Sequence, residues 1–253
     1  MIYLDGHILP EAEALIPVTD RGLQFGDGVF TTAKVVDGKI INWRGHHQRL
    51  ISHCGALGIT PPILTHQQIN DYIIAADATK GIWRLKVLIT AGGRGLTMKS
   101  RPYAHVIGTL SLYVPSDGAS RLYPVTVSLE GPLARIKTLS YLHRLFLFQQ
   151  AHAMGFDDVI TVSRDGYLLE SAFSNVFWIA DGVISTPDNS LPLLEGLSIV
   201  SILNDYSARG YKVDRGCWSL EQIPEHARVL TCNAMQTRRV SAIGDRVFPE
   251  TEK

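Results

Sequence analysis

The sequence lacks an excess of charge, a long apolar run and any paired cysteine pattern. Lys and Arg together number 24, and so do Asp and Glu, so net charge favours neither nucleic acid nor a membrane surface as a partner. No apolar run is long enough to cross a bilayer, and the N-terminus does not resemble a signal peptide. The three cysteines are widely separated, so we expect buried thiols and no metal site or disulfide framework. We therefore expect a cytoplasmic protein that acts on a small molecule.

The N-terminal half alternates between strand patterns and helix patterns. Asp37-Gly38 lies between two β-rich runs, which is typical of a hairpin turn. Helical periodicity follows over 44–58 and 67–78, and β-branched runs then return. These patterns predict an α+β domain over residues 1–112, followed by a linker over 113–121 that contains Pro, Gly and Ser.

The C-terminal half shows the same mixture, over a domain predicted at 122–253. A long apolar helix is expected over 138–155, and a meander of three strands then includes the run "YLLESAFSNVFWIADG" at 167–182. A second helix is expected over 198–210, and "ARVLTCNA" at 227–234 is interpreted as the last strand.

Lys137 is the first residue with a possible chemical role. It stands between a Gly-Pro turn and the start of the expected apolar helix. The positive end of the helix dipole, together with burial, would lower the pKa of its amine and favour a nucleophile. The alternative is a solvated lysine at a helix start.

Glu170 is the second candidate, because alternation along the strand directs it to the same face as Leu168. If that face is buried, the carboxylate requires a cationic or protonated partner. If Glu170 instead lies at the solvent edge of the hairpin, it requires none.

Two further features could hold a phosphate group. Gly196 precedes Leu197 and Ser198 at the start of a predicted helix, where free N–H groups and the Ser198 hydroxyl could bind an anion; an ordinary Ser N-cap is the alternative. Arg49, on the polar side of the first helix, could close this phosphate site or form a surface ion pair. Together, an amine, a carboxylate and a phosphate site match the requirements of pyridoxal phosphate.

Six motifs resemble, in order and spacing, the fold-type IV pyridoxal-phosphate enzymes. That family includes branched-chain and D-amino-acid aminotransferases and aminodeoxychorismate lyases. The resemblance implies an α+β fold with a small N-terminal α/β sandwich and a larger C-terminal pseudo-barrel that binds pyridoxal 5'-phosphate. The motifs are "FGDGVF" at 25–30, "HHQRL" at 46–50, "IKTLSYL" at 136–142, "ESAFSNVFW" at 170–178, "LLEGLSI" at 193–199 and "CNAM" at 232–235.

The same resemblance implies roles for individual residues. Lys137 would form the Schiff base and act as acid and base, Glu170 would pair with the pyridine nitrogen, and Asn175 would order the local backbone. Phosphate contacts would come from Arg49, Leu197, Ser198, Asn233 and Ala234. Substrate contacts would come from Phe30, Thr32 and Arg94, of which Arg94 could meet a carboxylate in a bidentate contact or lie on a surface loop.

Within the family, the Thr-Thr pair after Phe30 resembles the aminodeoxychorismate lyases, as does "AGGRGL" at 91–96. This likeness implies conversion of 4-amino-4-deoxychorismate to 4-aminobenzoate and pyruvate, a step of folate biosynthesis. "KTLSYL" at 137–142 instead resembles the D-amino-acid transaminases, so a D-amino-acid or branched-chain aminotransferase is the first alternative. A non-catalytic protein that binds a phosphorylated ligand is the second. The family also implies a homodimer with its sites near the interface.

Overall fold

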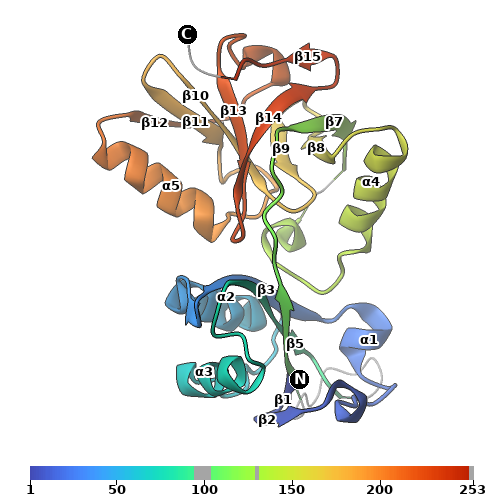
Figure 1. Cartoon of the computed structure of the whole chain (residues 1–253). Helices are drawn as coiled ribbons and strands as arrows, with labels where there is room; N and C mark the ends of the chain where they lie inside the picture. The colour runs from blue at the N-terminus through green and yellow to red at the C-terminus, as the bar shows by residue number, and fades with distance from the viewer. Residues whose placement is uncertain (94–103, 129–130, 251–253) are drawn as a thin grey trace. The chain divides into compact units, whose positions relative to one another are not determined.

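The chain forms two compact units, each built around its own sheet (Figure 1). The computed structural model describes residues 1–93, 104–128 and 131–250. Unit 1 comprises Met1–Pro115 and Ile136–Tyr141, and unit 2 comprises Ser116–Arg135 and Leu142–Lys253. Within the described ranges, no helix has the length and apolar character needed to span a membrane.

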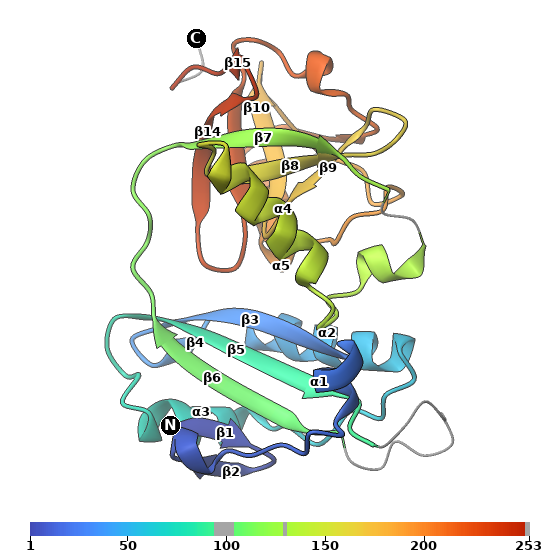
Figure 2. The same ribbon diagram turned by 90° about the vertical axis from the view of Figure 1, so that its right-hand side faces the viewer.

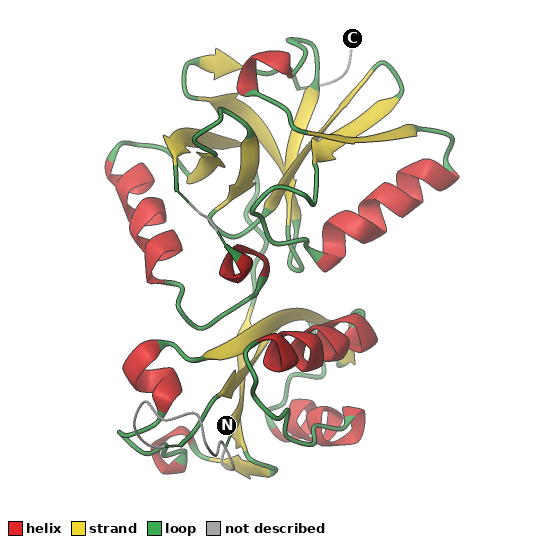
Figure 3. Cartoon of the chain, turned by 180° about the vertical axis from the view of Figure 1, so that it is seen from behind, coloured by secondary structure: helices red, strands yellow, loops and turns green. Residues whose placement is uncertain are grey.

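Unit 1 is a sheet with two helices on one face. The strand order is β2-β1-β6-β5-β3-β4, and β3 and β5 pair along their full lengths. Buried residues of α2 and α3 pack against inward-facing residues of β3 and β5, so these helices cover one face of the sheet (Figure 3). The elements are β1 Ile2–Leu4, β2 His7–Leu9, α1 Arg21–Phe25, β3 Gly28–Val36, β4 Lys39–Ile40, α2 Trp43–Ala56, α3 His66–Ala75, β5 Ile82–Thr90 and β6 Val106–Leu112.

The turn and helix-cap sequences of unit 1 adopt the structures that they predict. Asp37 and Gly38 both have positive φ, 47° and 78°, and connect β3 to β4 as the tight hairpin that their sequence indicates. Thr65 caps α3 with a reciprocal capping box through Gln68. The hairpin and the two helices predicted in this half are confirmed.

Unit 2 contains a nearly closed barrel. The strand order β12-β11-β10-β13-β14-β7-β8-β9 is joined by an additional pairing of β9 with β10, which closes a ring of strands. The predicted pseudo-barrel is therefore confirmed. The strands are β7 Ser120–Thr126, β8 Asp158–Val162, β9 Leu168–Ser171, β10 Asn175–Ala180, β11 Val183–Pro187, β12 Lys212–Gly216, β13 Arg228–Cys232, β14 Thr237–Ile243 and β15 Arg246–Val247.

Two helices pack on the outside of this barrel. Helix α4, Leu142–Ala153, lies against β8 through Leu147 and Ala151 (Figure 2). Helix α5, Leu197–Ala208, buries Ile199 and Leu203 against β10 and β13. The helix predicted over 198–210 is thus confirmed, and Gly210, with φ +90°, follows its end as expected.

Four expectations differ from the structure. The apolar helix begins at Leu142, not at residue 138, and the segment 136–141 belongs to unit 1 rather than to the C-terminal domain. "ARVLTCNA" is not the last strand, because β14 and β15 follow it; β14 alternates weakly, since it carries two arginines and a serine. Cys217 is exposed just after β12, whereas Cys54 and Cys232 are buried as expected.

Candidate active site

Lys137 lies in an extended segment that adds to the edge of the unit 1 sheet. The N–H of Phe30 donates to the Lys137 carbonyl at 2.9 Å, and the N–H of Leu139 donates to the Gly28 carbonyl at 2.9 Å. A β-bridge joins Val29 to Thr138 between these bonds. The backbone of Lys137 is thus held by β3, which explains why this segment belongs to unit 1. Since α4 begins five residues later, the expected effect of a helix dipole on Lys137 is wrong.

The two glycines of "FGDGVF" make room for this segment. A Cβ atom on Gly28 would lie 2.6 Å from Leu139 Cδ1 and closer still to the Ile89 carbonyl oxygen. Gly26 has φ +66°, and a Cβ atom there would meet the Ser140 hydroxyl. The Ser140 hydroxyl in turn donates to the carbonyls of Phe25 and Gly26, at 3.3 Å each. The motif therefore permits the close approach that fixes Lys137.

The amine of Lys137 rests on two aromatic rings. Its Nζ atom lies 4.5 Å from the ring centroid of Phe30 and 5.1 Å from that of Tyr141, and it donates to the Tyr141 hydroxyl at 3.1 Å. The two rings meet edge to face at 4.9 Å. Phe30 is buried, so the amine is fixed by apolar and polar contacts together.

Helix α2 carries two neutral histidines close to Lys137. The backbone N–H of Lys137 donates to His53 Nδ1 at 3.0 Å, and His46 Nδ1 forms a 2.7 Å hydrogen bond with the Thr31 hydroxyl. Burial, with added repulsion from the charges of Arg49 and Lys137, lowers the pKa of both imidazoles to about 4. A neutral His53 keeps the lone pair that accepts from Lys137.

The remaining unit 1 candidates are placed as follows. Arg49 lies half-buried on α2, where its charge acts on both histidines. Phe30 and Thr32 share one face of β3, since Val29, Thr31 and Ala33 point into the core. Arg94 lies outside the described residues.

Glu170 occupies the β9 position that closes the barrel against Asn175 of β10. Its side chain is buried, with 3% of the residue exposed, so the solvent-edge alternative is wrong. Arg144 Nη2 donates to Glu170 Oε1 at 2.5 Å and the N–H of Leu194 donates to the same oxygen at 3.1 Å. No donor within the described ranges bonds Oε2, so that oxygen can pair with a ring nitrogen.

Asn175 holds the loop that leads into α5. Its Nδ2 donates to the Leu194 carbonyl at 2.8 Å, and its Oδ1 accepts from the Gly196 N–H at 2.9 Å. A Cβ atom on Gly196 would clash with Oδ1, so any side chain here would displace the Asn175 amide from the loop. Glu170, the candidate partner of the ring nitrogen, also binds the Leu194 N–H. Residues 194–196 therefore connect Glu170 to the start of α5.

The start of α5 is open to an anion. Its N-cap is Gly196, no side chain caps the helix, and the first turn has no acidic residue. Ser198 is therefore inside the first turn and is not the N-cap that the alternative reading requires. The N–H groups of this turn, with the Ser198 hydroxyl, fit the phosphate of pyridoxal phosphate.

Asn233 and Ala234 form the turn between β13 and β14. The Asn233 side chain accepts from the N–H groups of Met235 and Gln236, at 2.8 and 3.2 Å, and donates to the Ser174 hydroxyl at 3.0 Å. Its side chain is thus used to shape the turn. Among the described residues, the N–H of Ala234 has no acceptor, so a phosphate contact from this turn would come from that backbone group. The turn follows Cys232, the strand partner of Asn175.

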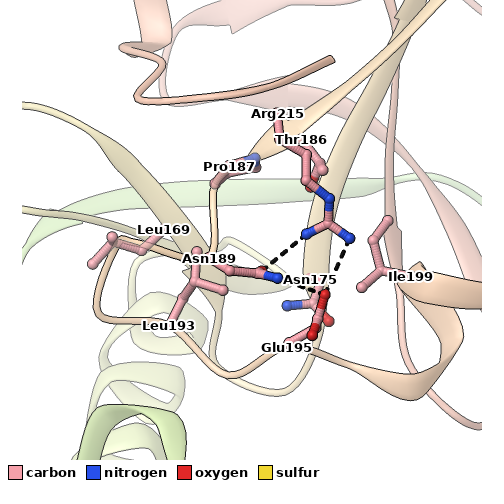
Figure 4. Close-up of a pocket in the computed structure, with 9 residues that line it drawn as sticks. All are labelled: Leu169, Asn175, Thr186, Pro187, Asn189, Leu193, Glu195, Ile199 and Arg215. Carbon is pink, nitrogen blue, oxygen red and sulfur yellow. Dashed lines mark hydrogen bonds and ion pairs between the residues drawn. The ribbon is translucent and has the colours of Figure 1, made fainter. Parts of the chain in front are cut away.

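A small pocket lies beside the Asn175 loop (Figure 4). Arg215 bridges Asn189 and Glu195 there, at 2.9 and 3.1 Å, and Asn189 also donates to Glu195 at 2.6 Å. Glu195 is itself part of the loop at 194–196, so these side-chain contacts hold one of its residues. These contacts brace the loop that leads into α5.

The predicted residues divide between the two units. Unit 2 brings Glu170, Leu197, Ser198, Asn233 and Ala234 around Asn175 and Ser174, whereas Lys137, Arg49, Phe30 and Thr32 lie in unit 1. The sequence did not indicate Tyr141, His53 or Arg144. Arg144 is an isolated cation in an otherwise apolar run, and this was the one available signal.

Unit 1 holds a lysine amine on aromatic rings, and unit 2 holds a buried carboxylate and an uncapped helix start; each is a feature that a pyridoxal-phosphate enzyme uses. The chain belongs to the amino-transferase class IV family, whose model matches residues 28–243. The family uses pyridoxal phosphate, and the structural neighbours are fold-type IV enzymes, so the predicted family, fold and cofactor are confirmed.

Three similar proteins carry related names. The chain is 28% identical over 278 residues to a bifunctional aminodeoxychorismate lyase / D-amino acid transaminase of Mycobacterium tuberculosis, covering 94% of this chain and 93% of that protein. A hypothetical aminotransferase of the same organism, solved in a PLP-bound form, superposes with a TM-score of 0.87 at 25% identity, over 99% and 93% of the two chains. A branched-chain aminotransferase of Thermoproteus uzoniensis superposes with a TM-score of 0.85 at 20% identity, over 98% and 89%, and shows the fold alone.

Proposed function

We propose that the protein is an aminodeoxychorismate lyase, which cleaves 4-amino-4-deoxychorismate to 4-aminobenzoate and pyruvate in folate biosynthesis. The observation that carries the proposal is the placement of Lys137 on Phe30, the residue that begins the lyase-like Phe-Thr-Thr run. The bifunctional relative, similar over nearly the whole of both chains, supports the same activity. The products contain all the atoms of the substrate, so the reaction consumes neither water nor an oxidant.

When bound, pyridoxal phosphate withdraws electron density from the amine-bearing carbon of the substrate. Lys137 takes the proton from that carbon, the bond between the ring carbon and the enolpyruvyl oxygen breaks, and the ring becomes aromatic. Lys137 then returns a proton to the methylene carbon of the leaving enol, which departs as pyruvate. The Tyr141 hydroxyl, 3.1 Å from Nζ, orients the amine during both transfers.

Glu170 would keep the ring nitrogen of the cofactor protonated through Oε2. Arg144 and the Leu194 N–H occupy Oε1, and they therefore fix the orientation of the carboxylate and offset its charge. The uncapped turn at Leu197 and Ser198, the Ala234 N–H and Arg49 would bind the phosphate. We also propose a homodimer, which sedimentation equilibrium of the purified protein would test.

The test is a direct product assay. Purified protein with cofactor is mixed with enzymatically generated 4-amino-4-deoxychorismate and no keto acid, and both products are quantified. We expect equal amounts of 4-aminobenzoate and pyruvate, none from Lys137→Ala, and wild-type amounts from Lys39→Ala, which removes an exposed lysine of the same unit. Absence of 4-aminobenzoate from the wild type would contradict the proposal.

A D-amino-acid transaminase is the second candidate, because the bifunctional relative also bears that name. It would use the same Lys137 to move a proton, but it needs a keto acid as amino acceptor. Consumption of D-alanine only when 2-oxoglutarate is supplied, without release of 4-aminobenzoate in the product assay, would favour the transaminase.

A further inference from the structure

The Lys137 peptide is bound by two different elements of unit 1. Its carbonyl accepts from the N–H of Phe30 on β3 at 2.9 Å, and its own N–H donates to His53 Nδ1 on α2 at 3.0 Å. A continued antiparallel pair would direct the Lys137 N–H to the Phe30 carbonyl, whereas here an imidazole accepts from it. The sheet therefore supplies one of these bonds, and a side chain 84 residues away supplies the other.

The chemistry of this bond fixes the state of His53. A backbone N–H can only donate, so Nδ1 is the acceptor and the ring proton resides on Nε2. A protonated imidazole would have no lone pair for the Lys137 N–H. Burial, with the charges of Arg49 and Lys137, lowers the pKa of His53 to about 4 and so keeps the ring neutral. At neutral pH His53 is therefore in the form that can hold the lysine.

Helix α2 connects this bond to a candidate phosphate contact. Arg49 and His53 are four residues apart, so their side chains lie on the same face of α2, one turn from each other. His46, one turn before Arg49, binds the Thr31 hydroxyl of β3 at 2.7 Å. The stretch of helix that carries Arg49 is thus tied to β3 at one end and to the Lys137 backbone at the other.

We propose that His53 is a positioning residue, which holds the Lys137 amine in the place relative to Arg49 that the aldehyde and phosphate of one cofactor molecule require. The proposal rests on the cofactor contacts of the proposed function, but not on the lyase reaction. His53 acts through the Lys137 backbone. Without its imidazole, the Lys137 peptide would turn toward the Phe30 carbonyl or toward water, and the amine would move with it.

The experiment separates the lysine from the other cofactor contacts. Equilibrium dialysis of the cofactor-free protein gives the dissociation constants of pyridoxal phosphate, whose aldehyde can bond to Lys137, and of pyridoxamine 5'-phosphate, whose amine cannot. Both ligands carry the same ring nitrogen and phosphate, so the ratio of the two constants reports the contribution of Lys137. In His53→Leu we expect the affinity for pyridoxal phosphate to fall by about fivefold to tenfold, the equivalent of one hydrogen bond, and the affinity for pyridoxamine phosphate to stay unchanged.

Three further variants complete the test. His53→Asn should restore the wild-type ratio, because an asparagine Oδ1 can occupy the place of Nδ1. His53→Gln should not, because its Oε1 lies one bond further from the backbone, and it gives the same loss if the leucine variant does not fold. His47→Leu removes a histidine of the same helix that stacks on Trp43, with 5.8 Å between the ring centroids, and should leave the ratio unchanged.

Each outcome has a defined meaning. A wild-type ratio in His53→Leu and His53→Gln overturns the inference. An equal fall for both ligands also overturns it, since His53 would then support the phosphate or ring contacts and not Lys137. So does a selective fall that His53→Asn fails to reverse, because the loss would come from packing and not from a missing acceptor.

The same data distinguish this inference from the lyase proposal. A selective fall that His53→Asn reverses, in a protein that releases no 4-aminobenzoate, supports the positioning role and overturns only the lyase reaction. A lyase whose His53 variants keep the wild-type ratio overturns the positioning role alone.

Discussion

Replacing Asn175 with alanine should weaken cofactor binding although Asn175 itself contacts backbone only. The side chain forms two hydrogen bonds with one loop, to the Leu194 carbonyl at 2.8 Å and from the Gly196 N–H at 2.9 Å. Asn175 has 8% of its surface exposed, so water cannot easily replace these bonds. The loop leads directly into the N–H groups that we assign to the phosphate.

The magnitude follows from the two bonds. Alanine leaves one carbonyl and one N–H without partners, and each unmet buried group costs about 1–3 kcal/mol. We expect the free energy of unfolding of the cofactor-free protein to fall by about 2–4 kcal/mol. If the first turn of α5 loses alignment with the phosphate, one charge-assisted bond is lost, which weakens the affinity for pyridoxal phosphate by about tenfold to a hundredfold.

Asn189→Ala is the matched control. Asn189 lines the pocket beside the same loop (Figure 4), but it binds the side chains of Glu195 and Arg215 and is exposed. Its loss should cost less than about 1 kcal/mol. Denaturant unfolding of the cofactor-free protein and equilibrium dialysis with pyridoxal phosphate give the two quantities. An Asn175→Ala protein that is destabilised yet binds the cofactor as tightly as Asn189→Ala would refute the reasoning.

Three other changes test neighbouring contacts. Tyr141→Phe keeps the ring against Phe30 but removes the bond to Lys137 Nζ, so kcat should fall by about tenfold or more with the cofactor affinity unchanged; an unaltered kcat would contradict the orienting role. Arg144→Met leaves the buried Glu170 carboxylate without its cation and should lower the free energy of unfolding by about 3–5 kcal/mol, as measured in urea. Burial raises the pKa of Asp158 from 3.8 to about 6, so the stability that this group contributes below pH 4 is lost as the pH rises through 6. Asp158→Asn should remove this dependence of the unfolding free energy on pH and add up to about 3 kcal/mol at pH 8. An unchanged pH dependence in the variant would show that another group titrates.

Local signals predicted most of the fold because the turns and caps agree with the hydrophobic pattern. Asp37-Gly38 adopts positive φ and forms the expected hairpin, and Asp181-Gly182 does the same between β10 and β11. The apolar face of α5 packs as its periodicity indicates. Each of these features depends on residues that are close in sequence, and here the tertiary contacts agree with the local signals.

The features that sequence reasoning missed depend on residues far apart in the chain. The bond from the Lys137 N–H to His53 spans 84 residues and the bond from Arg144 to Glu170 spans 26, and neither spacing follows a helical or strand period. The apolar run after Lys137 predicted a helix from residue 138, but the backbone of 137–139 pairs with β3 instead. Tertiary pairing therefore overrode helix propensity where the reactive lysine is placed.

This override gives the "FGDGVF" motif a physical role that is separate from substrate contact. Gly26 and Gly28 have no side chain because Ser140 and Leu139 occupy that space, and the strand that follows them presents Phe30 to the Lys137 amine. A single alanine at Gly28 would displace the Lys137 segment from β3 while every group that touches the amine remained in the sequence. Gly28 lies 109 residues before Lys137 in the sequence and Gly26 lies further still, yet the two glycines fix the position of the lysine. The two distant motifs must therefore be present together for this site to form.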